Sequence, residues 1–264
     1  IESPEEQAAR EARIAAQKRE NEAKAAAREK AGNDFRTREI AKARGKWERA
    51  EPIGGTDVAR YLHLRSGYLP QTGGLLRFDP TLDYWVGEKR DAIVIHTGPA
   101  MIAPFVGADG QIIGCHQTWI DLAQNPKFRP DLGLDAKGDP YPTKKMRGSK
   151  QGGFIPVAGY AVVNNGDGTW PRGGSVQPKF APAATRMVAG EGIETVLAVA
   201  YAENFRRDTL YVAAGDLGNL CGKADHASDF YHPTLTVADK VGRVRPKKIG
   251  GPLPDFSSPA MPVP

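Results

Sequence analysis

The strongest candidate for a chemical site is the stretch GEGIET, which begins at Gly190 and places a carboxylate between two glycines. Residues 185–190 are mostly apolar and predict a β-strand, and residues 192–204 predict a helix. Glu191 would then lie at the carboxyl edge of a sheet, where α/β folds place their ligands. Gly190 and Gly192 would allow the backbone to approach a ligand closely. A carboxylate in this position suits Mg²⁺, and it equally suits a simple cap of the following helix.

A second candidate is the basic segment KKMRGSKQGG, which lies in a stretch, residues 121–153, that predicts loop. Lys144, Lys145, Arg147 and Lys150 place four positive charges within seven residues, with no acidic residue among them. Cationic side chains and exposed backbone N–H groups in a glycine-bearing loop suit phosphate. The GxxxxGK[ST] spacing of a P-loop is absent, and a solvated basic turn is the plainer alternative.

We interpret the other reactive side chains as structural. The chain has two cysteines, Cys115 and Cys221, which excludes a disulfide scaffold and a four-cysteine zinc site and fits a reducing cytoplasm. Cys221, His226 and His232 do not have the spacing of a standard zinc site, and His116 follows Cys115 on a predicted strand. The G-x-S-x-G motif of the α/β hydrolases is also missing.

Composition restricts the class of protein. The chain has 264 residues, of which 40 % are hydrophobic and 25 % are charged, as in globular domains with a core. No apolar run is long enough to span a membrane and no signal peptide is visible, so we expect a cytoplasmic protein. The formal net charge of +5 is compatible with a polyanionic partner.

The elements that must position these residues begin with a long helix. Residues 1–46 predict one element, because residues 5–32 within them consist almost entirely of Ala, Glu, Lys, Arg and Gln, which favour helix. Ser3 and Pro4 provide a start signal. Apolar residues larger than Ala are rare before Phe35, so we expect an exposed charged helix or linker.

The next part, residues 47–183, predicts a mixed subdomain that is rich in β-hairpins. Residues 100–106 and 111–120 flank an Asp-Gly turn, which is a strong hairpin signal. A second hairpin is predicted between residues 154–163 and residues 169–170, across a turn rich in Asn and Gly.

The remainder predicts a β-α-β unit over residues 184–240 and an arm over residues 241–264. The strands of the unit, at residues 185–190 and 208–215, have the apolar composition of buried strands in a parallel sheet. The arm contains six prolines and several basic residues, so we expect it to be extended. The predicted fold class is α+β, with a long exposed N-terminal helix, a hairpin-rich mixed subdomain and a partial α/β unit.

Taken in this order, the segments resemble the Toprim-containing DNA primases of phages and plasmids. The resemblance spans about residues 47–222 and rests on AMIAPFVGADGQIIGCHQTWID, MRGSKQGG, VAGEGIETVLAVAYA and TLYVAAGDLGNL. It implies a Toprim-like unit and synthesis of RNA primers on single-stranded DNA from nucleoside triphosphates. A replicative helicase, separate or fused, is the further partner that the resemblance implies, and no membrane is involved.

The resemblance also assigns roles to the candidate residues. Glu191 would be the catalytic carboxylate and, together with Glu194, would hold Mg²⁺ or Mn²⁺. The basic segment would bind the phosphates of nucleotides or nucleic acid. The residues that would shape the site are Gly190, Gly192, Gly215, Asp216 and Asn219.

Two parts of the family's pattern are absent from the sequence. No Asp-x-Asp motif follows Glu191, because Asp229, Asp239 and Asp255 stand alone, and no zinc-binding module precedes the N-terminal helix. The chain begins with Ile1, so we expect a fragment of a longer primase, with zinc confined to a module that it lacks. The alternative is a non-catalytic nucleic-acid-binding or scaffold protein that has lost the second metal motif. Another Toprim activity, a nuclease or a topoisomerase, is disfavoured by the upstream subdomain.

Overall fold

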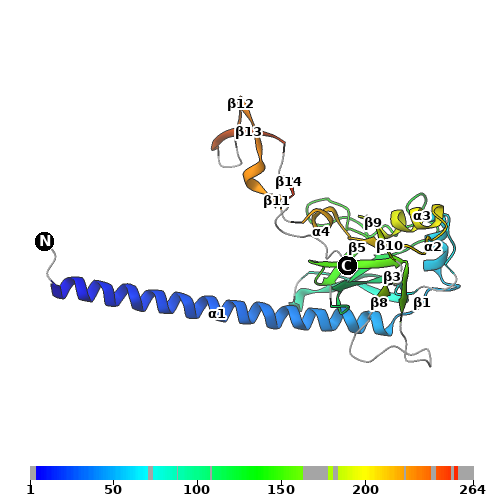
Figure 1. Cartoon of the computed structure of the whole chain (residues 1–264), viewed down its shortest axis with the longest axis horizontal. Coiled ribbons are helices and arrows are strands. Elements are labelled where there is room, and N and C mark those ends of the chain that lie inside the picture. The colour runs from blue at the N-terminus through cyan, green and yellow to red at the C-terminus, as the bar shows by residue number, and fades with distance from the viewer. Residues whose placement is uncertain are drawn as a thin grey trace.

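The computed structural model describes residues 4–70, 74–87, 89–107, 109–162, 178–180, 184–222, 224–238, 242–250 and 253–254. They form an α+β fold in which helices cover a mixed sheet of eight strands (Figure 1). The helices are α1 (Pro4–Arg49), α2 (Asp57–Ser66), α3 (Ile193–Ala202) and α4 (Leu217–Cys221), with 3-10 turns η1 (Lys89–Asp91) and η2 (His226–Ser228). The strands are β1 (Glu51–Pro52), β2 (Arg77–Val86), β3 (Ile93–Gly107), β4 (Ile112–Trp119), β5 (Lys144–Gly148), β6 (Gly153–Ala158), β7 (Tyr160–Val162), β8 (Pro178–Phe180), β9 (Arg186–Gly190), β10 (Thr209–Ala213), β11 (Ala224–Asp225), β12 (Phe230–Ala238), β13 (Val244–Gly250) and β14 (Leu253–Pro254).

The central sheet joins strands from distant parts of the chain. Its main path is β1-β2-β3-β6-β10-β9, and β4 and β5 form a branch that continues from β3. β10 is parallel to β9 and antiparallel to β6. The β-α-β unit is therefore present as predicted, but the sheet continues without a break across the expected boundary between residues 183 and 184.

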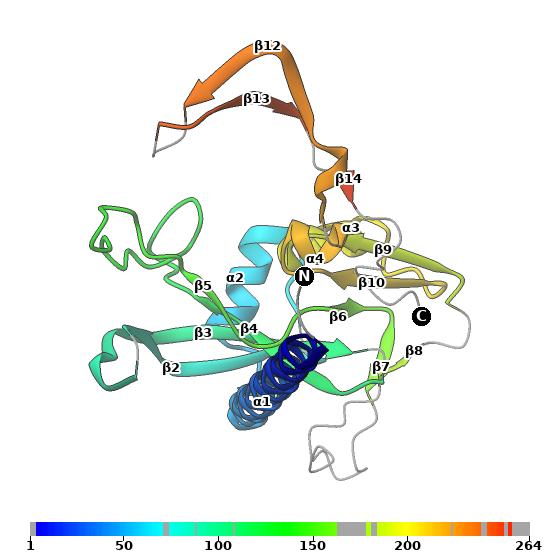
Figure 2. The same ribbon diagram turned by 90° about the vertical axis from the view of Figure 1, so that its left-hand side faces the viewer.

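Strand β3 supplies two cores, because successive side chains of a strand point to opposite faces. Met101 and Phe105 pack with residues of α2 and α3 on one face of the sheet. Ile102 packs on the other face with Trp47, near the end of α1. The sheet thus lies between two helical layers, with α1 on one side and α2 and α3 on the other (Figure 2).

Helix α1 packs against the sheet only through its last turns. Side chains from residue 12 to residue 38 are exposed, and the helix extends well beyond the sheet (Figure 1). Ala43, Trp47 and Ala50 are buried, and the Trp47 indole N–H donates a hydrogen bond of 2.7 Å to the Leu75 carbonyl. The prediction of an exposed helix is therefore confirmed for residues 12–38. The last turns of α1 instead pack on the sheet through Ala43, Trp47 and the adjoining Ala50. No helix in the described part of the chain combines the length and apolarity of a membrane span.

The hairpin around the Asp-Gly turn is confirmed. β3 and β4 pair antiparallel, with Ala100 opposite Trp119 at one end and Val106 opposite Ile112 at the other. The second predicted hairpin has a different pairing, because β6 pairs with β3 and β10 and β7 pairs with β8. The partner expected for it, residues 169–170, lies outside the described residues.

Strand pairings correct three further local expectations. Within residues 121–153, β5 pairs with β4, with Lys144 opposite Thr118, so the basic segment begins as a strand. β10 is the one strand that pairs with β9 among the described residues, so β9 is an edge strand, and its side chains are partly exposed rather than buried. The expected arm contains β13, which pairs with β12, with Val244 opposite Ala238. Both β5 and β13 carry cationic side chains on both faces, so neither shows the sustained alternation of apolar and polar residues that predicts a strand.

We expect Trp47→Ala to lower the free energy of unfolding by about 3–5 kcal/mol, because it empties a buried site between α1 and the sheet. The control is Ile14→Ala on the same helix, where a side chain that is 59 % exposed is removed and the change stays within about 0.5 kcal/mol. Urea unfolding followed by circular dichroism measures both. Equal stability of the two variants would contradict the docking of α1.

Candidate functional site

Two acidic residues follow neighbouring parallel strands at one edge of the sheet. Glu191 comes directly after β9, and Asp216 comes shortly after β10. The Gly215 N–H donates to the Glu191 carbonyl at 2.9 Å, and the Ala214 N–H donates to the Gly190 carbonyl at 2.8 Å. These bonds hold the two strand ends together. Glu191 is exposed at the carboxyl edge of the sheet, as the strand pattern predicts.

Two of the three predicted glycines are required by the geometry of this edge. Gly215 has φ of +84°, and a Cβ there would lie 2.5 Å from Cζ of Phe105. At Gly190, a Cβ would lie 2.8 Å from Cγ2 of Val196. Gly192 is the N-cap of α3 with an extended backbone, and a Cβ there meets nothing closer than 3.5 Å. Gly192 is therefore not required by packing.

Asp216 and Asn219 tie the end of β10 to the turn that precedes β6. The Asp216 carboxylate accepts a hydrogen bond of 2.9 Å from the Asn219 N–H and a charged contact from Lys150 Nζ. Asn219 is buried, and its Nδ2 donates to the carbonyls of Gly153 (2.8 Å) and Ala214 (2.9 Å). Burial alone would raise the pKa of Asp216. The hydrogen bond from Lys150 and the backbone N–H donors of α4 together have the larger effect, so the pKa lies below its usual value.

Glu194 lies one turn from Glu191 and is buried in a network of charged and polar groups. Its Oε1 accepts a hydrogen bond of 2.7 Å from Arg129 Nη2 and lies 3.3 Å from Lys144 Nζ. The Tyr61 hydroxyl donates to the same oxygen, and the Arg129 guanidinium lies over the Tyr61 ring. The network joins α2, the segment before β5, β5 itself and the first turn of α3.

Glu194 is held in its charged form. Burial alone would raise its pKa, but Lys144, the Tyr61 hydroxyl and Arg129 stabilise the carboxylate and lower the pKa to about 2. Burial and the neighbouring negative charge of Glu194 raise the pKa of Tyr61, which keeps its hydroxyl protonated as a donor. Glu194 is therefore a carboxylate at neutral pH, and Tyr61 is a neutral hydroxyl.

His116 is buried on β4 close to this network. Its Nδ1 lies 3.2 Å from the Thr118 hydroxyl. Burial and the positive charge of Lys144 lower its pKa to about 4, although Glu194 acts in the opposite direction. The ring is thus neutral at pH 7, which agrees with a structural role.

The structure divides the basic segment between two regions. Lys144 and Lys150 contact Glu194 and Asp216, near the carboxyl edge of β9 and β10. Lys145 instead lies over the Tyr84 ring, with Nζ 3.7 Å from the ring centroid, and Arg147 pairs with Glu39 of α1 at 3.2 Å. Alternation along β5 separates Lys144 from Lys145 and Arg147, because neighbouring side chains of a strand point to opposite faces, and Lys150 lies in the turn after β5.

The residues present do not make a complete metal site. Both oxygens of Glu194 are engaged by cations and a hydroxyl, so this carboxylate does not fit the role of a metal ligand. In the described part of the chain, no three or more His, Cys, Asp or Glu side chains are grouped so that they could hold a metal. Glu191 is exposed and fits as one metal ligand. Asp229 does not join it, because Asp229 pairs with Lys248 on the distant β12–β13 hairpin. Asp239 and Asp255 lie outside the described residues.

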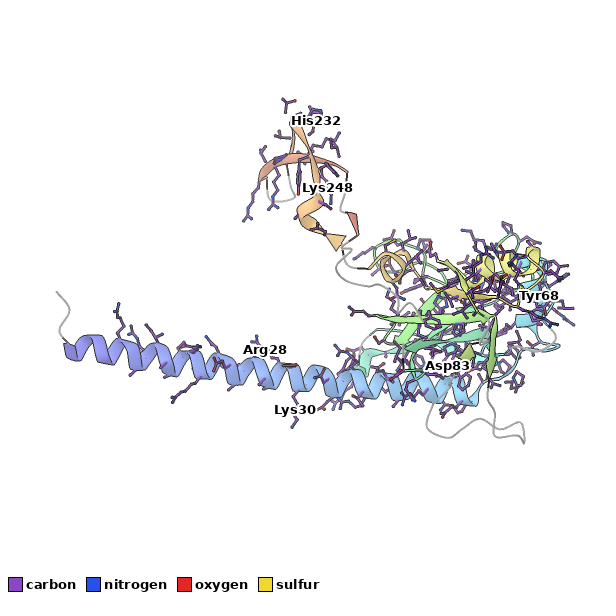
Figure 3. The ribbon with its side chains drawn as sticks, viewed as in Figure 1. Arg28, Lys30, Tyr68, Asp83, His232 and Lys248 are labelled. Carbon is purple, nitrogen blue, oxygen red and sulfur yellow. The ribbon has the colours of Figure 1, made fainter. Side chains whose placement is uncertain are left out.

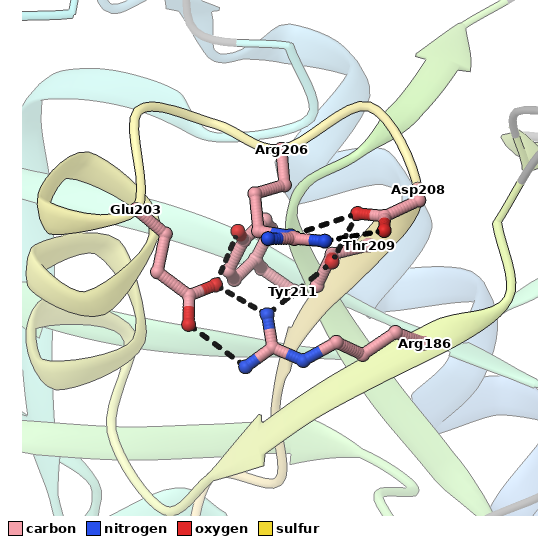
Figure 4. Close-up of polar contacts among 6 residues, drawn as sticks. All are labelled: Arg186, Glu203, Arg206, Asp208, Thr209 and Tyr211. Atoms are coloured by element: carbon pink, nitrogen blue, oxygen red, sulfur yellow. Dashed lines mark hydrogen bonds and ion pairs between the residues drawn. The ribbon is translucent and has the colours of Figure 1, made fainter.

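A second ionic network lies at the opposite end of the β-α-β unit, at the starts of β9 and β10 (Figure 4). Arg186 binds both oxygens of Glu203, at 2.6 and 2.8 Å, and the Tyr211 hydroxyl donates to Glu203 at 2.7 Å. Arg206 binds both oxygens of Asp208, at 3.0 and 2.6 Å. These groups satisfy one another and fasten the turn between α3 and β10, so they have a structural role.

Two residues of the buried network, Tyr61 and Arg129, were not predicted from the sequence. Tyr61 lies on the apolar face of α2, where the sequence pattern indicates a core residue. Arg129 lies in an irregular segment where no motif marks it. Nothing in the sequence distinguishes either from an ordinary structural residue, because their role depends on tertiary contact with Glu194.

A family model named Domain of unknown function (DUF7146) matches residues 37–157. The match runs from the docked end of α1 to β6 and contains Arg129 and the basic segment, whereas the unit made by β9, α3 and β10 lies beyond it. No curated protein and no solved structure matches the chain.

Glu194→Gln is expected to lower the free energy of unfolding at pH 7 by about 3 kcal/mol, because it leaves the charge of Arg129 buried without its counter-charge. Since the folded-state pKa of Glu194 is about 2, below its usual 4.5, its stabilisation is present above pH 4.5 and is lost as the pH falls towards 2. The variant should therefore lose less stability than the wild type over that range.

Urea unfolding at a series of pH values tests this expectation. The control is Glu20→Gln, which removes an exposed pair with Lys24 and costs no more than about 0.5 kcal/mol. An unchanged acid dependence in Glu194→Gln would show that Glu194 does not carry the charge described.

Proposed function

We propose that the chain is the core of a DNA primase, which joins ribonucleotides on a single-stranded DNA template in the cytoplasm. The observation that supports this most is the parallel pair β9 and β10, which brings the exposed carboxylate of Glu191 beside the turn of Asp216. Lys150 adds positive charge at the same edge. The resemblance of these segments to Toprim primases supports the same proposal. The proposal includes a longer parent protein, of which this chain is a part, and a helicase as a partner.

The proposed reaction needs an acidic group and cations close together. Phosphoryl transfer depends on positioning and on neutralising phosphate charge more than on a protein nucleophile. Lys150 and Lys144 are 40 % and 42 % exposed while they contact Asp216 and Glu194, so each can also contact the phosphates of a nucleotide. Glu191, exposed at the same edge, is suited to accept the proton that leaves the attacking hydroxyl.

Mg²⁺ or Mn²⁺ is the cofactor expected for this reaction, and of the two predicted ligands Glu191 alone fits. Such an ion supplies neutralisation of the charge on the transferred phosphate. Glu194 is assigned to the buried network instead. The role of Glu194 is then to fix the first turn of α3, and with it the backbone that carries Glu191.

The second candidate function is nucleic-acid binding or scaffolding without catalysis. It is favoured by one observation, namely that the described residues hold no cluster of three potential metal ligands. The two candidates differ in what Glu191 does. A primase depends on this carboxylate for synthesis, whereas a binding protein does not.

Glu191→Gln is expected to lower ribonucleotide incorporation on a single-stranded template by about a hundredfold or more, because a carboxylate that accepts a proton contributes that much. Binding of the template, measured by fluorescence anisotropy, should stay within about twofold, since removal of one surface acid does not weaken attraction to phosphate. The assay uses the whole chain with labelled ribonucleotides and Mg²⁺.

The matched control is Glu203→Gln, at the other end of the same unit, which should keep its activity. Loss of synthesis in both variants would point to damage of the fold. Absence of any metal-dependent incorporation by the wild type would favour the binding protein.

Lys150→Ala is expected to raise the KM for the nucleoside triphosphate by about tenfold, because a charge-assisted hydrogen bond to phosphate is worth that much. Lys145→Ala removes the same charge from the same basic segment, but its side chain lies over Tyr84, away from the edge. Steady-state kinetics of the two variants separates a site contact from a general loss of charge. Equal effects would contradict the assignment of Lys150.

A further inference from the structure

The β12–β13 hairpin projects from the rest of the molecule, as both ribbon views show (Figures 1 and 2). Its two strands form a separate antiparallel sheet, in which Tyr231 lies opposite Lys248 and Val237 lies opposite Arg245. Every described residue of β12 and β13 is exposed, except His232 and Gly250, which are half-buried. Neither the proposed reaction nor the core packing accounts for this element.

One strand of the hairpin is strongly basic. Arg243, Arg245, Lys247 and Lys248 lie within six residues and are exposed. Neither β12 nor β13 contains an acidic residue, and Asp229, just before β12, is paired with Lys248 at 2.6 Å. The hairpin therefore presents an excess of positive charge, which attracts a polyanion.

The other strand carries aromatic rings next to these cations. Phe230 and Tyr231 are 57 % and 52 % exposed, although large aromatic side chains are usually buried. Tyr231 lies opposite Lys248 across the hairpin, so this ring and this cation share one face, whereas Arg245 and Lys247 lie on the other face of β13. Rings that stack on bases, set beside cations that bind phosphates, are the features with which proteins hold single strands.

We propose that the β12–β13 hairpin binds single-stranded nucleic acid, with Tyr231 stacked on a base at one face and Arg245 and Lys247 contacting phosphates where the strand continues round the exposed hairpin to the other face. A duplex is a poorer fit, because its bases are already stacked on one another and leave no face for the ring. An anionic membrane surface would use the charge but would not depend on ring stacking. The proposal does not rest on the primase reaction, because it needs neither Glu191 nor a nucleotide.

The first test removes charge. The whole chain is titrated into a fluorescein-labelled oligo(dT) of about 20 nucleotides, long enough for a single-strand site, without metal or nucleotide. Arg245→Ala with Lys247→Ala should reduce the slope of log K against log salt by about 1.4, because each neutralised phosphate of a single strand contributes about 0.7. The control is Arg28→Ala with Lys30→Ala, which removes the same charge from the exposed part of α1 (Figure 3) and should leave the slope unchanged.

The second test removes the ring. Tyr231→Ala should weaken binding of the oligonucleotide by about fivefold or more, because stacking on one base is worth at least that much. Tyr231→Phe keeps the ring and should bind as the wild type does. Circular dichroism of each variant verifies that the fold is retained. If the alanine and phenylalanine variants bind equally well, no base stacks on Tyr231 and the proposal is overturned.

The remaining outcomes also decide the question. An equal reduction of the slope in the α1 control would assign binding to general charge, and tighter binding to duplex of the same length would exclude a stacking site. Vesicles with anionic lipid that compete equally with oligo(dT) would assign the hairpin to a membrane surface. Loss of binding in the hairpin variants, together with no incorporation by the wild type, would leave this proposal standing and remove the primase.

Discussion

The candidate site depends on one buried carboxylate that remains charged. Glu194 loses its hydration on folding, which costs several kcal/mol for an ion, and Arg129, Lys144 and Tyr61 offset that cost by direct contact. With Glu194 itself, these groups come from four separate segments, so the fold must assemble all of them before the carboxylate can be buried. In consequence the first turn of α3 has a fixed place against β5 and α2. Glu191, which precedes this turn, therefore has a fixed place at the edge of the sheet.

The two ends of the β-α-β unit differ in the way their charges are used. At the starts of β9 and β10, Arg186 and Glu203 satisfy each other, so that end closes a turn. At the carboxyl ends, Glu191 is exposed and Lys150 remains partly exposed. A partly exposed cation such as Lys150 can still bind the phosphates of a nucleotide, whereas a fully buried ion pair cannot. The parallel pairing of β9 with β10 creates this difference, because it places both carboxyl ends at one edge.

Much of the architecture could be predicted from the sequence, because local patterns determine it. The Asp-Gly hairpin of β3 and β4 and the β9–α3–β10 unit each have a signal within about 30 residues. The sequence could not show that β6 joins these parts into one sheet, nor that β5 and β13 are strands, since both carry cations on each face. In the site, the apolar strand before Glu191 and the glycines beside it mark this residue, whereas Gly215 is expected only from the resemblance to the primases. The sequence predicts Glu194 as a metal ligand, whereas the structure places it in a buried ionic network. The sequence does not show this network, because the contacts of Glu194 with Tyr61 and Arg129 join segments more than 60 residues apart.

The proposed site requires a nucleoside triphosphate to bind at the carboxyl edge of β9 and β10. Amide hydrogen exchange of the whole chain, with and without a ribonucleoside triphosphate and Mg²⁺, detects such binding. We expect slower exchange in residues 148–153, 190–195 and 214–219, which form this edge, and no change at the opposite end of the unit. Protection that is absent from all three segments, or confined to the β12–β13 hairpin, would contradict it.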